Sequence, residues 1–433
     1  MAPTMGQDHE LLDVSEARNR LLSFFSPLGM ESVPLAHAAG RVLAQDIVSP
    51  LDLPPFDNSA MDGFALRAAD VIQASLLSPA ELNVVADIPA GNAAAVRIEP
   101  GQAARIMTGA AMPAGADCVV PVEDTDFHQR QAGTVAPDKV RIFKALSTGA
   151  NVRPAGQDLR HGQMVMAAGR KIHPADTGLL AMLGMARPVV WRRPRVAIIS
   201  SGDELLPPEA PLTPGKIRDA NTYTLCGLVD EAGAQAINLG IVADQPLAVE
   251  AALSRAIDQA ADLIVSSAGV SVGAMDFVRS VVEQKGRLDF WRVNMRPGKP
   301  LAFGSYWDTP FVGLPGNPVS AFVGFEVFVR PALLKMQGLR QLLRPAWPAR
   351  MLEPVESDGR ESYLRSVVSW QAGELTARLT GHQGSGNLHS LVQANALLLI
   401  PSGVKYVPSG GLVQAWLLDN GSETLATETS PVN

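Results

Sequence analysis

Four short segments rich in small and charged residues could together bind a phosphate group. They are SSGDEL at 200–205, SSAGVSVGAMD at 266–276, RPGKP at 296–300 and GLPGNPVS at 313–320. Gly and Ser let backbone N–H groups approach an anion closely, and Arg296 and Lys299 would add side-chain donors. Carboxylates among these donors indicate a bridging divalent cation, for which oxygen ligands favour Mg²⁺. Each segment alone could be a structural turn, but four within one region favour a phosphate-bearing ligand.

The elements before these segments should bring them together. Each segment follows a short apolar run, namely RVAIIS, LIVS, FWRVNM and FVGL. Helix-like stretches alternate with these runs, at 222–231, 247–260, 277–284 and 319–336. This alternation predicts an α/β domain over 187–337, with a parallel sheet covered on both faces. Ligands bind beyond the carboxyl ends of strands in such sheets, so all four segments should line one crevice.

The rest of the chain predicts further modules. A helix is expected from Ser15, as its N-cap, to a point before Pro27. Short Val- and Ile-rich runs between residues 82 and 144 predict a small β module, and residues 349–420 again suggest short strands. A Pro-rich linker at 341–348 precedes this last module. The expected fold class is therefore α/β plus β modules.

Composition excludes several kinds of function. The net charge is −7 and only 5% of the 433 residues are aromatic, which disfavours nucleic-acid binding. The two cysteines, Cys118 and Cys226, are too few for a disulfide framework or a Cys-rich zinc site. No apolar run of membrane-spanning length and no signal-peptide pattern occur. We therefore expect a cytoplasmic protein that contacts neither membrane nor nucleic acid.

Taken together, the motifs resemble those of the MoeA family, the molybdopterin molybdenumtransferases, which also include the C-terminal domain of gephyrin. Within the α/β domain the matching segments are GDE at 202–204, SSAGVSVGAMD, RPGKP and GLPGNPVSA. Outside it, the matching segments in chain order are PPFDNSAMDGFA at 54–65, RIMTGA at 105–110, GQDL at 156–159 and TGHQGSG at 380–386. The resemblance covers essentially the whole chain.

The resemblance implies an activity and an architecture. The expected reaction inserts molybdenum from molybdate into adenylylated molybdopterin and releases AMP, assisted by Mg²⁺. The expected fold is an elongated multi-domain chain that forms a homodimer, with the active cleft between subunits. Its domains would be a discontinuous N-terminal domain (8–53 and 155–186), an inserted small β domain (54–154), the molybdopterin-binding α/β domain (187–337) and a C-terminal β-barrel (346–420).

The resemblance also implies roles for individual residues. Three residues with catalytic roles would come from the partner subunit: Asp62, Thr108 and Asp158. Carboxylates for the metal would be Asp203, Glu204 and Asp276, the last two also having catalytic roles. The pterin and its phosphates would contact Ser271, Gly273, Asp244, Pro315, Pro318 and Ser320. Candidate molybdate ligands are Arg296, Lys299, Arg365 and Ser385.

Simpler structural roles remain open for several of these residues. Asp62 could form an Asx-turn, Asp244 could cap the helix after Pro246, and Asp158 could be a turn carboxylate. Thr108 could be an ordinary strand-end hydroxyl, and Ser385 a turn residue between glycines.

The chain departs from many relatives at Arg292 and Arg296, where Lys is common. Arg keeps the charge but is planar and larger, so molybdate affinity could change while the reaction type should not. Two other functions remain alternatives, namely adenylyl transfer to molybdopterin and a gephyrin-like binding scaffold. The choice between molybdenum and tungsten stays open, as do contacts with a molybdopterin adenylyltransferase or with molybdoenzyme chaperones.

Overall fold

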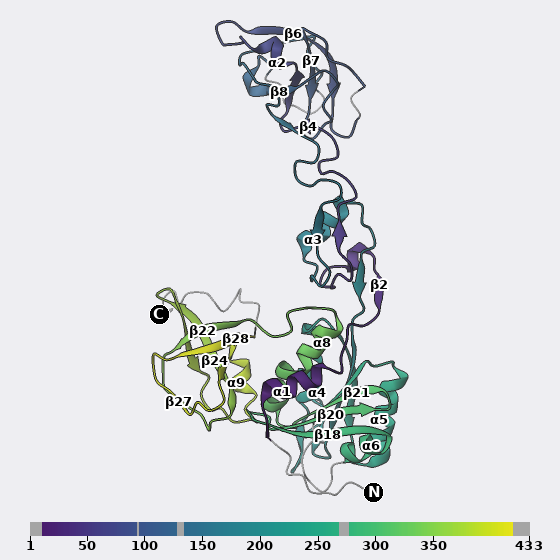
Figure 1. Ribbon diagram of the computed structural model, residues 1–433, viewed down its shortest axis with the longest axis vertical. Helices are drawn as coiled ribbons and strands as arrows, with labels where there is room; N and C mark the ends of the chain where they lie inside the picture. The colour runs from purple at the N-terminus through teal and green to yellow at the C-terminus, as the bar shows by residue number, and fades with distance from the viewer. Residues whose placement is uncertain (1–10, 93–94, 128–133, 268–276, 419–433) are drawn as a thin grey trace. The chain divides into compact units, whose positions relative to one another are not determined.

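The computed structural model describes residues 11–92, 95–127, 134–267 and 277–418 (Figure 1). The chain divides into two compact units. Unit 1 comprises Met1–Gln45, Gly169–Thr177 and Ala186–Asn433, and unit 2 comprises Asp46–Ala168 and Gly178–Met185.

The centre of unit 1 is a seven-stranded sheet in the order β1-β18-β20-β21-β17-β13-β16. Its strands are β1 (Leu11–Leu12), β13 (Arg195–Ser201), β16 (Gln235–Val242), β17 (Leu263–Ser267), β18 (Gly286–Val293), β20 (Pro300–Tyr306) and β21 (Thr309–Leu314). Strands β16, β13, β17 and β21 pair in parallel, whereas β20 runs antiparallel to both neighbours. Two successive antiparallel pairings make β18 parallel to β21. The carboxyl ends of all four expected strands therefore lie at the same edge.

The middle of the central strand β13 is apolar on both faces, and both faces are covered. Along β13, Val196 and Ile198 pack into one core, while Ala197 and Ile199 pack into the other. Helices α1 (Val14–Leu22), α4 (Asn221–Glu231) and α8 (Arg330–Met336) cover the first face. Helices α5 (Pro246–Asp258) and α6 (Phe277–Lys285) cover the second (Figure 1). This arrangement confirms the expected sheet covered on both faces, and the sheet is mostly rather than wholly parallel.

Three details differ from expectation. The antiparallel strand β20 was not predicted, since its sequence PLAFGSY follows directly on the RPGKP turn. The N-cap of α1 is Asp13 rather than Ser15, and the helix ends at Leu22. The predicted helix 319–336 forms, but as α7 (Pro318–Gly324), a π-helical turn η3 (Phe325–Val329) and α8.

The C-terminal module is a closed β-barrel, as expected. Its strands are β22 (Ala346–Met351), β24 (Glu361–Gln371), β25 (Glu374–Leu379), β26 (Ala396–Ile400) and β28 (Leu412–Leu417). The order β24-β25-β22-β28-β26 closes on itself because β26 also pairs with β24. A short strand, β19 (Met295–Arg296), extends from the α/β domain and pairs in parallel with β24. This pairing links the RPGKP segment to the barrel.

Unit 2 contains a five-stranded sheet in the order β8-β5-β7-β6-β9. Its strands are β5 (Gly63–Leu66), β6 (Ala80–Ile88), β7 (Gln102–Ile106), β8 (Cys118–Pro121) and β9 (Lys139–Ile142), with α2 (Ala68–Val71) between β5 and β6. The sheet lies within the predicted small β domain, although the four domain boundaries themselves stay predictions. Smaller elements complete the chain: β2 (Met30–Ser32), η1 (Leu35–His37), β3 (Ile47–Val48), β4 (Asn58–Ser59), η2 (Val122–Asp124), β10 (Val152–Arg153), β11 (Met164–Met166), α3 (Pro174–Met182), β12 (Val189–Trp191), β14 (Leu205–Leu206), β15 (Ile217–Arg218), β23 (Val355–Glu356), α9 (His389–Val392) and β27 (Tyr406–Val407).

A buried ion pair should hold the segment before the barrel onto the α/β domain. Arg344 donates from Nε and Nη2 to the two carboxylate oxygens of Glu326, at 2.7 and 3.0 Å, and Glu326 is buried. We expect Glu326→Gln to lower the free energy of unfolding by about 3–5 kcal/mol, because it removes the buried carboxylate that faces both Arg344 and Arg330 and leaves Arg344 paired with the exposed Glu231. Urea denaturation measures this. In the control Glu16→Gln, which breaks an exposed helix pair with Arg20, the loss should stay below about 0.5 kcal/mol. Equal losses would contradict the role of burial.

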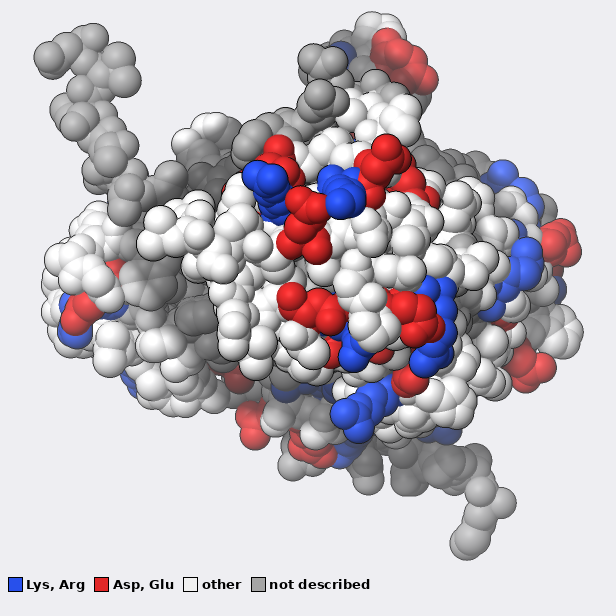
Figure 2. Space-filling model, turned by 90° about the horizontal axis from the view of Figure 1, so that it is seen from above, with Lys and Arg blue, Asp and Glu red and all other residues white. Residues whose placement is uncertain are grey.

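Among the described residues, the longest apolar helical segments fall short of what crossing a membrane needs. The face drawn in Figure 2 carries acidic and basic side chains close together.

Candidate functional site

Carboxylates gather at the carboxyl ends of β13 and β16. The backbone N–H of Asp244 donates to Oδ1 of Asp203 at 3.1 Å, and the Ser201 hydroxyl donates to the Asp244 carboxylate. Asp203 is exposed and Asp244 is half-buried. The N-cap of α5 is Gln245, so Asp244 binds Ser201 rather than acting as that helix's cap. Two predicted site carboxylates therefore lie side by side.

Glu204, the third described carboxylate here, is exposed and folds back over the preceding turn. A Cβ added at Gly202 would come within 2.6 Å of its carboxylate oxygen, at a φ of +156°. Only glycine accepts this position comfortably, which explains the Gly of the GDE motif.

Asn221 joins the ends of β17 and β21, and the sequence motifs did not reveal it. Its Nδ2 donates to the Ser267 hydroxyl at 2.5 Å and to the Gly316 carbonyl at 2.7 Å. A carbonyl can only accept, so the amide orientation is determined. Its Oδ1 is buried and has no hydrogen-bond partner in the described part of the chain. A buried acceptor held in this way is suited to a ligand N–H group.

Segments that carry cationic and hydroxyl residues meet at the other end of the crevice, where the barrel contacts the α/β domain. The Val319 N–H donates to the Ser385 carbonyl at 3.0 Å, which places the TGHQGSG loop against the first turn of α7. Buried Ser320 follows in the same turn, and a Cβ added at Gly298 would lie 3.5 Å from its carbonyl oxygen. Three predicted segments, each from a different element, therefore meet around α7.

Arg365 reaches this meeting point from inside the barrel. It is fully buried, and it donates from Nε to the Ser390 hydroxyl and from Nη2 to the Gly384 carbonyl, both at 3.0 Å. Burial and, secondly, the nearby charge of Arg296 lower the pKa of Arg365 to about 10. Two arginines brought together with one of them buried favour a bound oxyanion.

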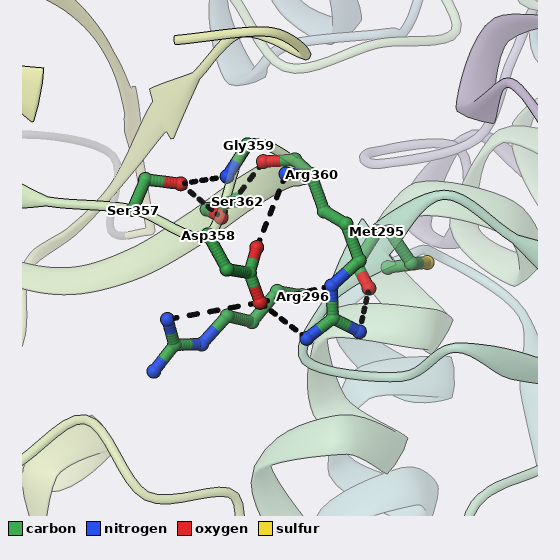
Figure 3. Close-up of polar contacts among 7 residues, drawn as sticks. All are labelled: Met295, Arg296, Ser357, Asp358, Gly359, Arg360 and Ser362. Carbon is green, nitrogen blue, oxygen red and sulfur yellow. Dashed lines mark hydrogen bonds and ion pairs between the residues drawn. The ribbon is translucent and has the colours of Figure 1, made fainter. Parts of the chain in front are cut away.

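Asp358 and Arg360 complete this cluster, and both lie outside the recognisable motifs (Figure 3). The Asp358 carboxylate accepts from Nε of Arg360 at 3.0 Å and lies 4.0 Å from Nη1 of Arg296. Arg360 also donates from Nη1 to the Met295 carbonyl at 3.3 Å, beside Arg296. Hydrogen bonds from Arg360, with a smaller contribution from the charge of Arg296, lower the pKa of Asp358. A carboxylate from the barrel thus lies beside the Arg296 side chain.

The remaining residues predicted for this region have simpler surroundings. Lys299 is exposed, and its carbonyl accepts from the Val293 N–H at 2.8 Å. Pro315 is buried at the end of β21, and Pro318 begins α7. Ser271, Gly273 and Asp276 lie outside the described residues.

In unit 2, Asp62 and Thr108 are in direct contact. Oδ1 of Asp62 accepts from both the backbone N–H and the hydroxyl of Thr108, at 2.7 Å each. The next residue, Gly63, has no room for a side chain, because a Cβ there would lie 1.9 Å from the Val120 carbonyl oxygen. The exposed Asp62–Thr108 contact therefore joins the two motifs NSAMDG and RIMTGA at the surface of unit 2. Asp158 is exposed, and its N–H donates to the Leu53 carbonyl at 2.8 Å.

The described residues contain no group of three His, Cys, Asp or Glu side chains that could hold a metal ion. Asp203, Glu204 and Asp244 nevertheless supply the oxygen donors that Mg²⁺ prefers. A complete metal site would need a further ligand, and the predicted one is Asp276.

Comparisons with known proteins agree with this arrangement. Residues 12–184 match the MoeA N-terminal region (domain I and II), 197–335 match a probable molybdopterin binding domain, and 348–418 match the MoeA C-terminal region (domain IV). The chain is 42% identical over 393 residues to molybdopterin molybdenumtransferase 2 of Mycobacterium tuberculosis, covering 89% of this chain and 94% of that protein.

It is also 35% identical over 421 residues to the molybdopterin molybdenumtransferase of Bacillus subtilis, covering 95% and 96% of the two chains. A crystal structure of a molybdopterin biosynthesis MoeA protein from Pyrococcus horikoshii is 32% identical, with a TM-score of 0.79. It covers 95% of this chain and 100% of that one. With the matched regions in order from residue 12 to residue 418, the chain belongs to the MoeA family of molybdopterin molybdenumtransferases.

Proposed function

We propose that this enzyme of molybdenum cofactor biosynthesis takes molybdenum from molybdate, inserts it into adenylylated molybdopterin and releases AMP. The observation that best supports the proposal is the meeting of Arg296, Ser320 and Arg365 where the barrel contacts α7. A buried guanidinium beside a second guanidinium is stabilised by a tetrahedral dianion, and hydroxyl donors complete such a site. Lys299 and Ser385 would supply further donors.

The pterin would lie along the middle of the sheet edge. The orphaned Asn221 Oδ1 offers an acceptor for a pterin N–H group, and 268–276 would supply the predicted phosphate cradle. From β13 to β18 there are four strand spacings, which span about 19 Å at ~4.8 Å each. A substrate with a nucleotide at one end and a pterin at the other could occupy such a length.

Magnesium would be held by Asp276 with Glu204 and Asp203, and its chemistry there is to neutralise charge on the pyrophosphate. An oxygen of molybdate, or a water oriented by it, would attack the adenylyl phosphorus, and the phosphoanhydride bond would break with its bridging oxygen kept by the pterin phosphate. AMP would leave with the attacking oxygen; if that oxygen comes from molybdate, its Mo–O bond would break as molybdenum binds the dithiolene sulfurs. Arg296 and Arg365 would keep the oxyanion in place during this step.

Two other functions compete with this proposal. Adenylyl transfer predicts an adenylylated product from ATP and molybdopterin without molybdate, and a pure scaffold predicts no AMP release at all.

Asp358 should affect molybdate binding more than catalysis. In Asp358→Asn, Arg296 loses its carboxylate neighbour, so we expect the KM for molybdate to rise about tenfold while the KM for adenylylated molybdopterin changes less than about twofold. Steady-state AMP release at varied molybdate measures this. Asp358→Glu should restore part of the affinity. Asp308→Asn changes an exposed carboxylate in the β20–β21 turn and serves as the control. A fall in kcat alone would contradict the role.

The predicted homodimer shares each site between subunits, which makes a complementation test possible. Asp62→Asn and Asp276→Asn should each be inactive alone. Mixed dimers should recover about one quarter of wild-type activity, because half of the dimers are mixed and each has one intact site. Asp62→Asn mixed with Thr108→Val should stay inactive, since both residues would serve the same half of the site. Recovery in neither mixture would indicate that each subunit works alone.

Contacts with a molybdopterin adenylyltransferase or with molybdoenzyme chaperones, and a cytoplasmic location, remain predictions of the family resemblance.

A further inference from the structure

A pocket of about 280 Å³ opens on unit 1 away from the crevice described above. It lies at the far end of the helix that begins at α7: Arg330 follows Ser320 by ten residues, or about 15 Å of helix rise. The walls come from the N-terminal segment, from the end of α4, from α8 and from the chain leading to the barrel. The lining residues that matter here are Val42, Lys171, Glu231, Arg330, Leu334 and Arg344.

Arg344 has no donor to spare for a ligand. Beyond its two bonds to Glu326, its Nη1 donates to the Leu417 and Leu418 carbonyls at 3.0 and 3.1 Å, and its Nη2 donates to Glu231 at 2.8 Å. All five guanidinium hydrogens therefore have acceptors. Arg344 is a structural part of the pocket wall.

Arg330, by contrast, is left without a matched acceptor. Its Nε lies 3.9 Å from the Glu326 carboxylate, which Arg344 already occupies, and this Nε is buried without a hydrogen-bond partner. Among the described residues, four buried side-chain polar atoms lack partners, and only that of Arg330 belongs to a residue lining this pocket. Burial and, secondly, the charge of Arg344 lower the pKa of Arg330. A buried donor without an acceptor indicates that a bound ligand supplies the acceptor.

The charges around the pocket leave a positive excess. Three cations, Lys171, Arg330 and Arg344, face two carboxylates, Glu231 and Glu326, so the sum is +1. Lys171 is exposed at the pocket and could reach a ligand from the solvent side. The rest of the lining is mainly apolar, with Val42 and Leu334 among others. One negative charge on an apolar body would match both features.

We propose that this pocket binds a small organic monoanion, a carboxylate or a phosphate monoester with a compact apolar body, whose oxygens pair with Arg330 and Lys171. A guanidinium fork suits both kinds of oxyanion. A volume of about 280 Å³ is enough for one compact molecule. The Glu231 carboxylate at the wall disfavours more highly charged anions. The site is separate from the proposed molybdenum chemistry, so the inference does not depend on that proposal.

Benzoate and its cationic isostere benzamidine are suitable probes, with acetate and inorganic phosphate to separate the apolar from the anionic requirement. At constant ionic strength, benzoate should raise the Tm of the full-length protein, phosphate and acetate should do so less, and benzamidine should have no effect. Calorimetric titration gives the Kd. Arg330→Gln should raise the Kd for benzoate about tenfold, because a charge-assisted hydrogen bond is lost.

Further variants keep the test decisive if Arg330→Gln folds poorly. Lys171→Gln changes an exposed side chain and should raise the Kd about threefold. Arg340→Gln, an exposed neighbour that does not line the pocket, should leave the Kd unchanged. Molybdenum transfer should stay within about twofold of wild type in all three variants. If benzoate and benzamidine behave alike, or if no variant changes the Kd, the proposal is wrong.

The chain's own acidic end is a rival occupant, since residues 419–433 carry Asp419, Glu423 and Glu428 beyond Leu418, whose carbonyl binds Arg344. A protein truncated after Leu418 tests this. Equal benzoate affinity in both forms supports a diffusible ligand. Binding that appears only after truncation would assign the pocket to the chain's own end and overturn the proposal, as would an absence of binding in both.

Discussion

Arg365→Lys should lower kcat/KM for molybdate about 100-fold or more while leaving the barrel folded. Arg365 is fully buried and fixed by Ser390 and Gly384, so its remaining donors are preorganised for an oxyanion. Lysine keeps the charge but cannot reproduce the planar fork, and the loss of two charge-assisted hydrogen bonds accounts for the magnitude. Steady-state AMP release at varied molybdate, alongside a thermal melt, gives both quantities.

The matched control is Arg378→Lys, an exposed arginine on the neighbouring barrel strand β25. It should retain wild-type kinetics and Tm. A large drop in Tm for Arg365→Lys with an unchanged KM for molybdate would mean that Arg365 only supports the barrel. That outcome would remove the strongest support for the oxyanion site.

Asp276→Asn should reduce AMP release about 1,000-fold or more, the largest effect expected for a single carboxylate. The residue lies outside the described part of the chain, so its role rests on its motif and on the carboxylates at the same sheet edge. If it holds Mg²⁺, its amide would bind the cation weakly, and the pyrophosphate would lose its main charge neutralisation. Single-turnover AMP release, measured across a range of Mg²⁺ concentrations, tests this.

Asp258→Asn, an exposed change at the end of α5, should behave as wild type. The Tm of Asp276→Asn should also match that of the wild type in the absence of Mg²⁺. Undiminished turnover in Asp276→Asn would show that other carboxylates hold the metal, with Asp203 and Glu204 the next to test.

The site was largely predictable because its parts follow strands with a common direction. The run Val196–Ile199 is apolar on both faces, which identified a buried parallel strand, and parallel strands place their carboxyl ends together. The four segments after these strands could therefore be assigned to one edge before the fold was known. The contact between Asp62 and Thr108 was not predicted, because it joins residues 46 positions apart; the family motifs only assigned both residues to the same part of the site.

Other parts of the site depend on tertiary contacts that leave no local signal. Asp358 and Arg360 look like ordinary turn residues, and they matter because β19 pairs with β24 and brings Arg296 beside them. The importance of Asn221 likewise lies in two bonds to distant strand ends. Strand β20 was missed because it follows the Pro297–Gly298 turn with no helix before it, so the expected alternation of strands and helices did not apply.

AMP release by the purified protein from adenylylated molybdopterin tests the proposed function most directly, with molybdate present, tungstate substituted, or both omitted. The amount of AMP should match the amount of molybdenum bound to the pterin, and without an oxyanion only background release should occur. Activity with tungstate would extend the substrate range without changing the mechanism. AMP release that is independent of any oxyanion, or none in the presence of molybdate and Mg²⁺, would contradict the proposed function.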